Sequence, residues 1–189
     1  MAEHPARGDR TALLVIDMLN TYEHEDADRL VESVRPAVPK IRKLIDRARA
    51  EDACILWVND NFGDWNSSSE KLAQAARRGR YPDLVEPVLP SEDDMFVLKT
   101  RHSVFFSTPL EYLLESMGVG RIVLTGQVTE QCILYSAVDG YVGHFEVAVV
   151  RDGVAHIHEH LARAAMEMME HNMHAEVGAA DEIELKGSR

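Results

Sequence analysis

Short, continuously apolar runs alternate along the chain with longer amphipathic stretches. The runs are bounded by turn residues, and they predict buried strands at 11–17, 54–60, 95–99, 121–126 and 146–152. The stretches between them place apolar residues at helical spacing and predict helices at 28–50, 69–77, 108–117, 130–142 and 158–172. Pro36 and Pro39 further predict that the first helix begins or bends near them. A last, edge strand is expected within 175–185.

Strands that are apolar throughout and separated by helices are typical of a parallel sheet covered on both faces. The sequence therefore predicts the α/β class, with three α/β/α layers around a mostly parallel central sheet. A length of 189 residues fits one domain. The pattern places this domain at 11–183, with 1–10 and 184–189 as mobile termini. The segment 61–94 contains several glycines and prolines and predicts loops. These loops are expected to cap the substrate site described below and to set its specificity.

The balance of charge determines which partners are expected. With 20 Lys and Arg against 32 Asp and Glu, the net charge is −12, which repels the backbone of nucleic acids. No apolar run approaches the roughly 20 residues that span a bilayer, and the start of the chain lacks the apolar core of a signal peptide. The expected partner is therefore a small-molecule substrate in the cytoplasm, without nucleic acid or membrane.

Chemically reactive side chains follow the predicted strands. In an open parallel sheet, ligands bind outside the carboxyl ends of the strands. Asp17 and Lys99 end the first and third predicted strands, and Cys132 opens the helix after the fourth. Asp60 ends the second strand, whereas the other cysteine, Cys54, lies in an apolar run and is predicted to be buried and inert. We therefore expect Asp17, Lys99 and Cys132 to meet at one edge of the sheet as a catalytic set.

These three side chains complement one another chemically. A cysteine attacks as its thiolate, and the helix start and the Lys99 ammonium both favour that form. Asp17 would accept the thiol proton and return it to a leaving amine, while backbone N–H groups before the helix face the developing oxyanion. The sequence thus predicts a Cys132 pKa below the ordinary value of about 8.5, coupled to the titration of Asp17. Taken singly, each residue also has a plainer interpretation as a helix cap, a solvated strand end or an inert thiol.

Aromatic residues flank the predicted strand ends. Several are expected to line a substrate pocket, with packing in the core as the alternative. For Phe105 the sequence favours neither interpretation over the other. The pocket candidates are Tyr22, Phe62, Trp65, Phe105 and Tyr135. The histidines at 156, 158 and 160 do not share one helical face, and the two cysteines have no metal-ligand spacing. Neither a metal site nor a cofactor is therefore predicted.

Three segments carry a family resemblance that covers about 11–180 of the chain. Asp17 lies in LLVIDMLNTY, Lys99 in FVLKTRHSVFFSTPLEYLL and Cys132 in IVLTGQVTEQCILYSAVDGY. These segments resemble the D-M-Q-N-D-F, K-x-x-x-S-x-F-x-x-T-x-L and G-x-x-T-x-x-C patterns of isochorismatase-like cysteine hydrolases, which include nicotinamidase and N-carbamoylsarcosine amidase. The resemblance implies an isochorismatase-like, Rossmann-like fold, and it implies a catalytic triad at Asp17, Lys99 and Cys132.

The resemblance also implies an activity. It implies hydrolysis of a C–N bond in a small amide, imide or carbamoyl compound, through a thioester on Cys132 and without a cofactor. It further implies a non-proline cis peptide bond between Val128 and Thr129, whose expected role is to aim the N–H groups of an oxyanion hole. Cys132 argues against the vinyl-ether chemistry of phenazine-type isochorismatases, which lack this cysteine.

The chain departs from the family at positions that bear on the substrate. Leu19 replaces the usual glutamine, and Thr21 replaces a usual aspartate. Where nicotinamidases carry an Asp-x-His metal-binding element, this chain has Asp60, Asn61 and Phe62, and so lacks the histidine. The resemblance therefore predicts neither a zinc site nor nicotinamide as the substrate.

Two other functions stay open from the sequence. A non-catalytic binding or assembly module on the same fold is compatible with the acidic surface and with Leu19, but it leaves the triad unexplained. A thiol redox sensor would use Cys132 without hydrolysis and would form a stable sulfenic acid with peroxide.

We predict that the chain self-associates. The predicted helix 158–172 and the residue after it carry more apolar positions than one core-facing stripe requires, namely Ala162, Ala164, Ala165, Met166, Met168, Met169 and Met173. The final edge strand also needs cover, and the family resemblance implies a dimer or a tetramer. Light scattering at micromolar concentration should give at least twice the mass of one 21.2 kDa chain, the dimer being favoured on symmetry grounds. A mass near 21.2 kDa would contradict the prediction.

Overall fold

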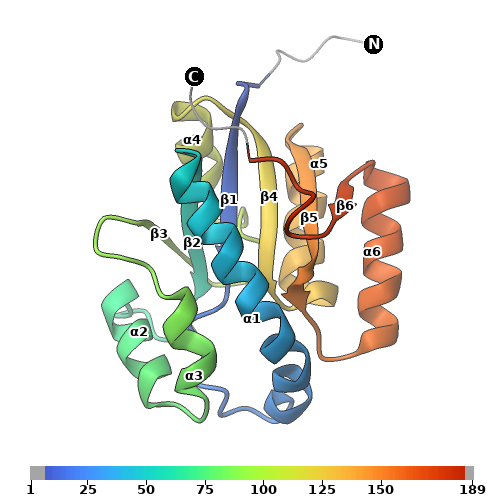
Figure 1. Ribbon diagram of the computed structural model, residues 1–189. Helices are drawn as coiled ribbons and strands as arrows, with labels where there is room; N and C mark the ends of the chain where they lie inside the picture. The colour runs from blue at the N-terminus through green and yellow to red at the C-terminus, as the bar shows by residue number, and fades with distance from the viewer. Residues whose placement is uncertain (1–6, 186–189) are drawn as a thin grey trace.

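A six-stranded sheet forms the middle layer of the molecule (Figure 1). In the computed structural model, which describes residues 7–185, all paired strands are parallel, in the order β3-β2-β1-β4-β5-β6. The strands are β1 (Arg10–Ile16), β2 (Cys54–Asp60), β3 (Met95–Lys99), β4 (Val119–Gln127), β5 (Glu146–Ala155) and β6 (Glu176–Gly178). The predicted strands and the predicted α/β class are confirmed.

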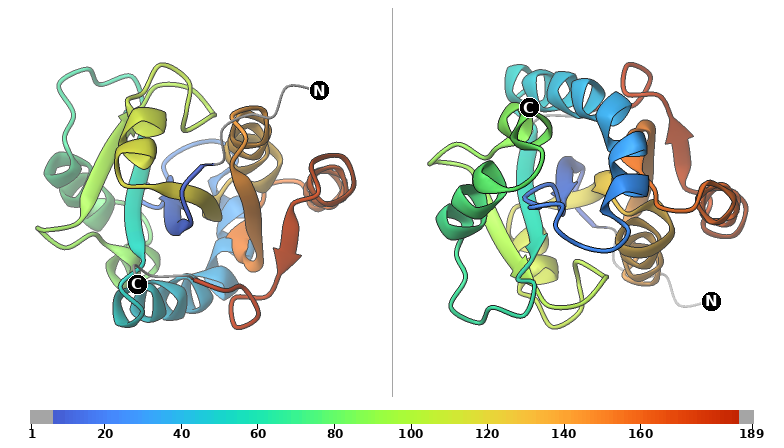
Figure 2. Two further views of the ribbon diagram at one scale, coloured as in Figure 1. Left: turned by 90° about the horizontal axis from the view of Figure 1, so that it is seen from above. Right: turned by 90° about the horizontal axis from the view of Figure 1, so that it is seen from below.

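Helices cover both faces of this sheet (Figure 2). The helices are α1 (Ala27–Ala50), α2 (Ser69–Arg78), α3 (Pro82–Val85), α4 (Leu110–Ser116), α5 (Leu134–Val142) and α6 (Glu159–Met173), with a 3₁₀ turn at Glu86–Val88 and a π-helical turn at Thr129–Ile133. Apolar residues of α1, α2 and α3 pack into the core on one face, and those of α4, α5 and α6 pack into the core on the other. None of the helices in 7–185 combines the length and the apolar character needed to cross a lipid bilayer.

The alternating side chains of β1 explain why the strands are apolar throughout. Leu13 and Val15 pack into the core beneath α1, whereas Leu14 and Ile16 pack into the opposite core. Because successive side chains of a strand point to opposite faces, most positions of a strand covered on both faces lie against a hydrophobic core. The sheet is therefore the shared wall of two hydrophobic cores.

Two local features bear on the sequence-based expectations. Helix α1 begins at Ala27, close to the predicted start at 28, and Pro36 and Pro39 both lie inside it, so the helix does not begin near the prolines. Its buried side chains recur along the whole helix, so packing against the sheet outweighs the helix-breaking tendency of proline. In the segment predicted as loops, the chain forms α3 and the 3₁₀ turn, whose buried residues contribute to the core beneath α1.

The predicted mobile termini lie partly outside the described residues, since nothing is placed at 1–6 and 186–189. Within the described part, the Arg7 guanidinium pairs with Glu111 at 2.6 Å and with Glu115 at 3.0 Å. At the other end, Leu185 is buried in the core beneath α1. Described residues on both sides of 11–183 thus contact the fold, and the predicted domain bounds stay a prediction.

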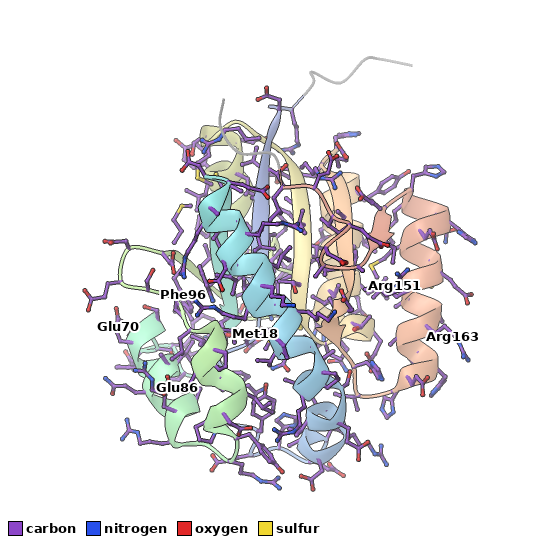
Figure 3. The ribbon with its side chains drawn as sticks, in the orientation of Figure 1. Met18, Glu70, Glu86, Phe96, Arg151 and Arg163 are labelled. Atoms are coloured by element: carbon purple, nitrogen blue, oxygen red, sulfur yellow. The ribbon has the colours of Figure 1, made fainter. Side chains whose placement is uncertain are left out.

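Helix α6 uses only some of its apolar residues against the sheet. Ala162, Ala165 and Met169 are buried, whereas Met168 is exposed. Arg163 extends away from the body of the molecule on the outer side of this helix (Figure 3). Self-association through this region stays a prediction.

The carboxyl ends of the strands lie toward the lower side of Figure 1, where the chain passes from β1 to α1. At this edge β4 approaches β1 very closely, because Gly126 pairs with Ile16. Gly126 has a φ of +115°, and a Cβ atom there would lie 2.1 Å from the Ile16 carbonyl oxygen. A glycine is therefore required just before the turn that carries Cys132.

Replacing Gly126 with alanine should lower the free energy of unfolding by about 2–5 kcal/mol, since the variant combines left-handed strain with a backbone clash. Gly63→Ala is the matched control. Gly63 also has a positive φ, +83°, but no heavy atom lies within 4 Å of its added Cβ. Only the strain of about 1–2 kcal/mol is expected there. Urea unfolding measures both, and an equal loss in the two variants would contradict the close approach of β4 to β1.

Candidate active site

Lys99 is the centre of the candidate site. Its side chain is fully buried, and its Nζ lies 2.8 Å from Asp17 Oδ2 and 3.6 Å from Cys132 Sγ. The Asp17 carboxylate also acts on the thiol, since it raises the pKa of Cys132. The structure thus brings together a carboxylate, an ammonium and a thiol that follow three different strands.

Backbone geometry fixes the Asp17 carboxylate. Asp17 has a φ of 55°, in the left-handed region that few residues other than Gly, Asn and Asp adopt readily. Its N–H donates to the Val58 carbonyl at 2.9 Å, and the Gln127 amide nitrogen Nε2 donates to its carbonyl at 2.6 Å. The Asp60 N–H donates to Oδ1 at 2.7 Å, which leaves Oδ2 to pair with Lys99. Strands β2 and β4 therefore hold the carboxylate from both sides.

Cys132 lies in the π-helical turn after β4 rather than at the start of an α-helix. The Ile133 N–H donates to the Val128 carbonyl at 3.1 Å, and the Ser136 hydroxyl donates to the Cys132 carbonyl at 2.5 Å. The Thr129 hydroxyl donates to the Ala155 carbonyl at 2.9 Å and so ties the turn to β5. These bonds hold the thiol beside Lys99.

The cis peptide bond lies one residue earlier than predicted, between Gln127 and Val128. The predicted position, between Val128 and Thr129, is therefore wrong. The pairing of β4 with β5 continues through Gln127, so the chain leaves the sheet directly after that residue. The Val128 backbone, directly after this bond, opposes the rise in the pKa of the Cys132 thiol.

Burial raises the pKa of both the carboxyl and the thiol. For Asp17, burial outweighs the opposing effect of the Lys99 ammonium and of several hydrogen bonds. For Cys132, burial is again the largest cause, and the Asp17 carboxylate raises the pKa further while Lys99 lowers it. The predicted lowering of the Cys132 pKa is therefore wrong for the free protein, because one ammonium does not offset burial beside a carboxylate.

Lys99 keeps its charge in this setting. Burial alone would lower its pKa, but the Asp17 carboxylate, the Cys132 sulfur and Asp60 together raise the pKa to about 12. A transfer of the thiol proton to Asp17 leaves the total charge of the cluster unchanged, whereas loss of that proton to solvent adds a buried negative charge. The arrangement thus favours proton transfer within the cluster over ionisation of the thiol into water.

Asp60 belongs to the same cluster, although the sequence analysis gave it no part in the triad. Its Oδ2 lies 3.4 Å from Lys99 Nζ, and its Oδ1 accepts the Phe62 N–H at 2.8 Å. Its position at the end of β2 was the feature of the sequence that could have indicated its place in the site. Lys99 is therefore shared between two carboxylates and a thiol.

His102 is a site residue that the sequence analysis missed. Its Nδ1 lies 3.9 Å from Cys132 Sγ, and its ring stacks on Tyr135 with centroids 5.4 Å apart and planes 22° apart. The only signal in the sequence was its place three residues after Lys99, in the loop that follows β3. Of the predicted pocket aromatics, Tyr135 is the one that contacts a neighbour of the thiol, because it stacks on His102.

The other predicted pocket aromatics divide into two kinds. Tyr22 is fully buried, with its hydroxyl 3.4 Å from Gln127 Oε1, and Phe105 stacks on Phe145 in the core. For these two residues, packing inside the protein is what the structure shows. Phe62 and Trp65 are exposed, at 57% and 82%, and their role in a pocket stays a prediction.

The histidines near the start of α6 make local contacts. His156 Nδ1 lies 3.0 Å from the Ser33 hydroxyl, and the rings of His158 and His160 are 6.1 Å apart. Across 7–185, no group of three or more His, Cys, Asp or Glu side chains is arranged to hold a metal ion.

Three kinds of comparison relate the chain to known proteins. The family model of the isochorismatase domain matches residues 11–182. The chain is 30% identical to YaaI of Bacillus subtilis, an isochorismatase family protein, over 91% of this chain and 95% of that protein. It is 32% identical to a probable inactive nicotinamidase of Arabidopsis thaliana, over 79% and 82%. The solved structure of N-carbamoylsarcosine amidase from Thermoplasma acidophilum has a TM-score of 0.69 and 25% identity, covering 93% of this chain and 99% of that one.

Replacing Lys99 with methionine should lower the free energy of unfolding by about 3–5 kcal/mol at pH 7, because Asp17 then lies buried without its cation. The pKa of Asp17 is raised in the folded protein, so its ionised form opposes folding above the unfolded pKa. The loss should therefore shrink as the pH falls below 7 and Asp17 takes up a proton. Urea unfolding at pH 7 and at a lower pH measures this change.

The double variant Asp17→Asn/Lys99→Met is the matched control, since it removes both charges of the pair. It should recover most of the stability lost by Lys99→Met. An equal loss at both pH values, without recovery in the double variant, would show that the ion pair contributes little.

Proposed function

This chain belongs to the isochorismatase family, and we propose that it is a cysteine hydrolase that cleaves the C–N bond of a small amide through a thioester on Cys132. The observation that carries this proposal is the contact of one buried ammonium with both a thiol and a carboxylate. Lys99 Nζ lies 3.6 Å from Cys132 Sγ and 2.8 Å from Asp17 Oδ2. A nucleophile, an acid–base group and a fixed positive charge are the parts that acyl transfer requires.

Acylation begins with proton transfer inside the cluster. The S–H proton of Cys132 passes to the Asp17 carboxylate, and the thiolate attacks the substrate carbonyl carbon to form a C–S bond. The resulting oxyanion is stabilised by backbone N–H groups of the turn at Val128 and Thr129. Protonated Asp17 then donates its proton to the leaving nitrogen, the C–N bond breaks, and the amine or ammonia departs.

Deacylation uses the same groups in reverse. The Asp17 carboxylate takes a proton from water, and the hydroxide attacks the thioester carbonyl. The C–S bond breaks, the acid product leaves, and the thiolate recovers its proton from Asp17. Lys99 keeps its charge throughout and stabilises the thiolate in both halves. Because Asp17 must be ionised to accept the proton and its pKa is raised, kcat/KM should fall as the pH drops through the Asp17 pKa.

The substrate class follows from the relatives and from the site. An N-carbamoylsarcosine amidase shares the fold at 25% identity, which supports an amide, imide or carbamoyl group as the reacting unit. Asp60 pairs with Lys99, so its carboxylate is already engaged in the charge cluster. This pairing supports chemistry that needs no metal. Free thiols at Cys54 and Cys132 fit a reducing compartment such as the cytoplasm.

A panel of primary amides, imides and N-carbamoyl compounds, with nicotinamide included, tests the proposal through release of ammonia or amine. On a compound that is turned over, Cys132→Ser should lower kcat/KM by at least about 10³-fold, and Asp17→Asn by about 10²–10⁴-fold. Cys54→Ser is the matched control, because Cys54 lies at the opposite end of β2 from the candidate site. It should keep the activity of the parent.

Two results would contradict the proposal. One is undiminished turnover in Cys132→Ser. The other is the absence of turnover across the panel together with a Cys132 that does not react with small alkylating agents. The second result would favour a non-catalytic binding module on the same fold.

A further inference from the structure

An imidazole borders the solvent side of the Cys132 thiol. On its buried side the sulfur faces Lys99 and Asp17, whose exposed fractions are 0% and 6%. On its other side lies His102, an exposed residue whose Nδ1 is 3.9 Å from Sγ. The sulfur therefore lies between two buried charged groups and one exposed ring.

Two sets of contacts hold His102 in this place. Its ring stacks on Tyr135, which lies one helical turn after Cys132. The loop that carries His102 is also bonded to the turn that carries the thiol, because the Val104 N–H donates to the Ser136 hydroxyl at 3.1 Å and that hydroxyl donates to the Cys132 carbonyl at 2.5 Å. Val104 and Ser136 are fully buried. The position of His102 relative to Cys132 is therefore fixed by the core, although its ring reaches solvent.

We propose that His102 is a further catalytic residue, whose Nδ1–H donates a hydrogen bond to the Cys132 sulfur once the thiol proton has passed to Asp17. The inference rests on the proposed cysteine chemistry. In this step the S–H bond breaks and an O–H bond forms on Asp17. No proton leaves His102. The thiolate is then held between the Lys99 ammonium on its buried side and the imidazole on its solvent side.

The charges that surround the sulfur explain why a second donor matters. Lys99 is shared by Asp17 at 2.8 Å, by Asp60 at 3.4 Å and by the sulfur at 3.6 Å. Once Asp17 carries the thiol proton, the ammonium is still shared between the thiolate and the Asp60 carboxylate, which lies nearer to Nζ than the sulfur does. Hydrogen bonds to charged groups are stronger than those between neutral groups, so a donor at His102 adds most when the sulfur is ionised.

His102→Phe tests the inference, because phenylalanine keeps a ring to stack on Tyr135 but removes the N–H. We expect the rate of Cys132 alkylation by iodoacetamide near pH 7 to fall about tenfold, with a higher apparent pKa of alkylation across a pH series. The kcat/KM for an amide that the parent hydrolyses should fall by a similar factor. Thermal melting should stay unchanged, since the residue is exposed.

Two further variants make the result specific. His102→Asn places an amide N–H near the position of Nδ1, and it should recover much of the alkylation rate and of kcat/KM. His171→Phe replaces an exposed histidine on α6 and should match the parent in every measurement. If His102→Phe itself fails to fold, His102→Leu, which also lacks an N–H donor, replaces it in the comparison with His102→Asn.

Each outcome decides the matter. A His102→Phe variant with the parent's alkylation rate, pH profile and kcat/KM overturns the inference and leaves the proposed function standing. An equal loss in His102→Phe and His102→Asn, with an unchanged pH profile, shows a purely structural role and also overturns it. A parent whose Cys132 is unreactive and which hydrolyses no amide overturns the proposed function and this inference together.

Discussion

A buried lysine ammonium is the interaction on which the rest of this site depends. Lys99 is fully enclosed, and an ammonium without a partner in such a place would be strongly unfavourable. The register of the sheet provides the partners, because Lys99 pairs with Asp60 between β3 and β2. Strand β1 lies beside β2 and ends at Ile16, so that Asp17 follows directly at the same edge. The parallel order of the strands therefore assembles the charge cluster.

The cluster also determines how the thiol works. Burial and the neighbouring carboxylate raise the pKa of Cys132, so the resting protein holds a thiol rather than a thiolate. In the proposed mechanism the nucleophile forms by proton transfer to Asp17 within the cluster, at unchanged total charge. Oxidation by peroxide requires an accessible thiolate, so the burial and the raised pKa of Cys132 disfavour a redox sensor in the resting protein.

The sequence was sufficient to predict the order of strands and helices, because apolar runs and amphipathic stretches report burial directly. It was also sufficient to place Asp17, Lys99 and Cys132 at one sheet edge, since strand ends and topology decide that edge. It failed on the pKa of Cys132, because the depth of burial of the thiol is not visible in the sequence. It failed on His102 for a related reason. Contact across the loop after β3 depends on the hydrogen bonds through Ser136, which no periodicity reveals.

A covalent intermediate on the nucleophile is the central claim. Acid quenching during turnover of an amide, followed by trypsin digestion and mass spectrometry, would locate it. The peptide 122–151 contains Cys132, and the peptide 50–71 contains Cys54, so each thiol is reported separately. The mechanism predicts an acyl group on 122–151 alone, which hydroxylamine removes as expected for a thioester. Turnover without any acyl group on that peptide, or with the acyl group on another residue, would contradict it.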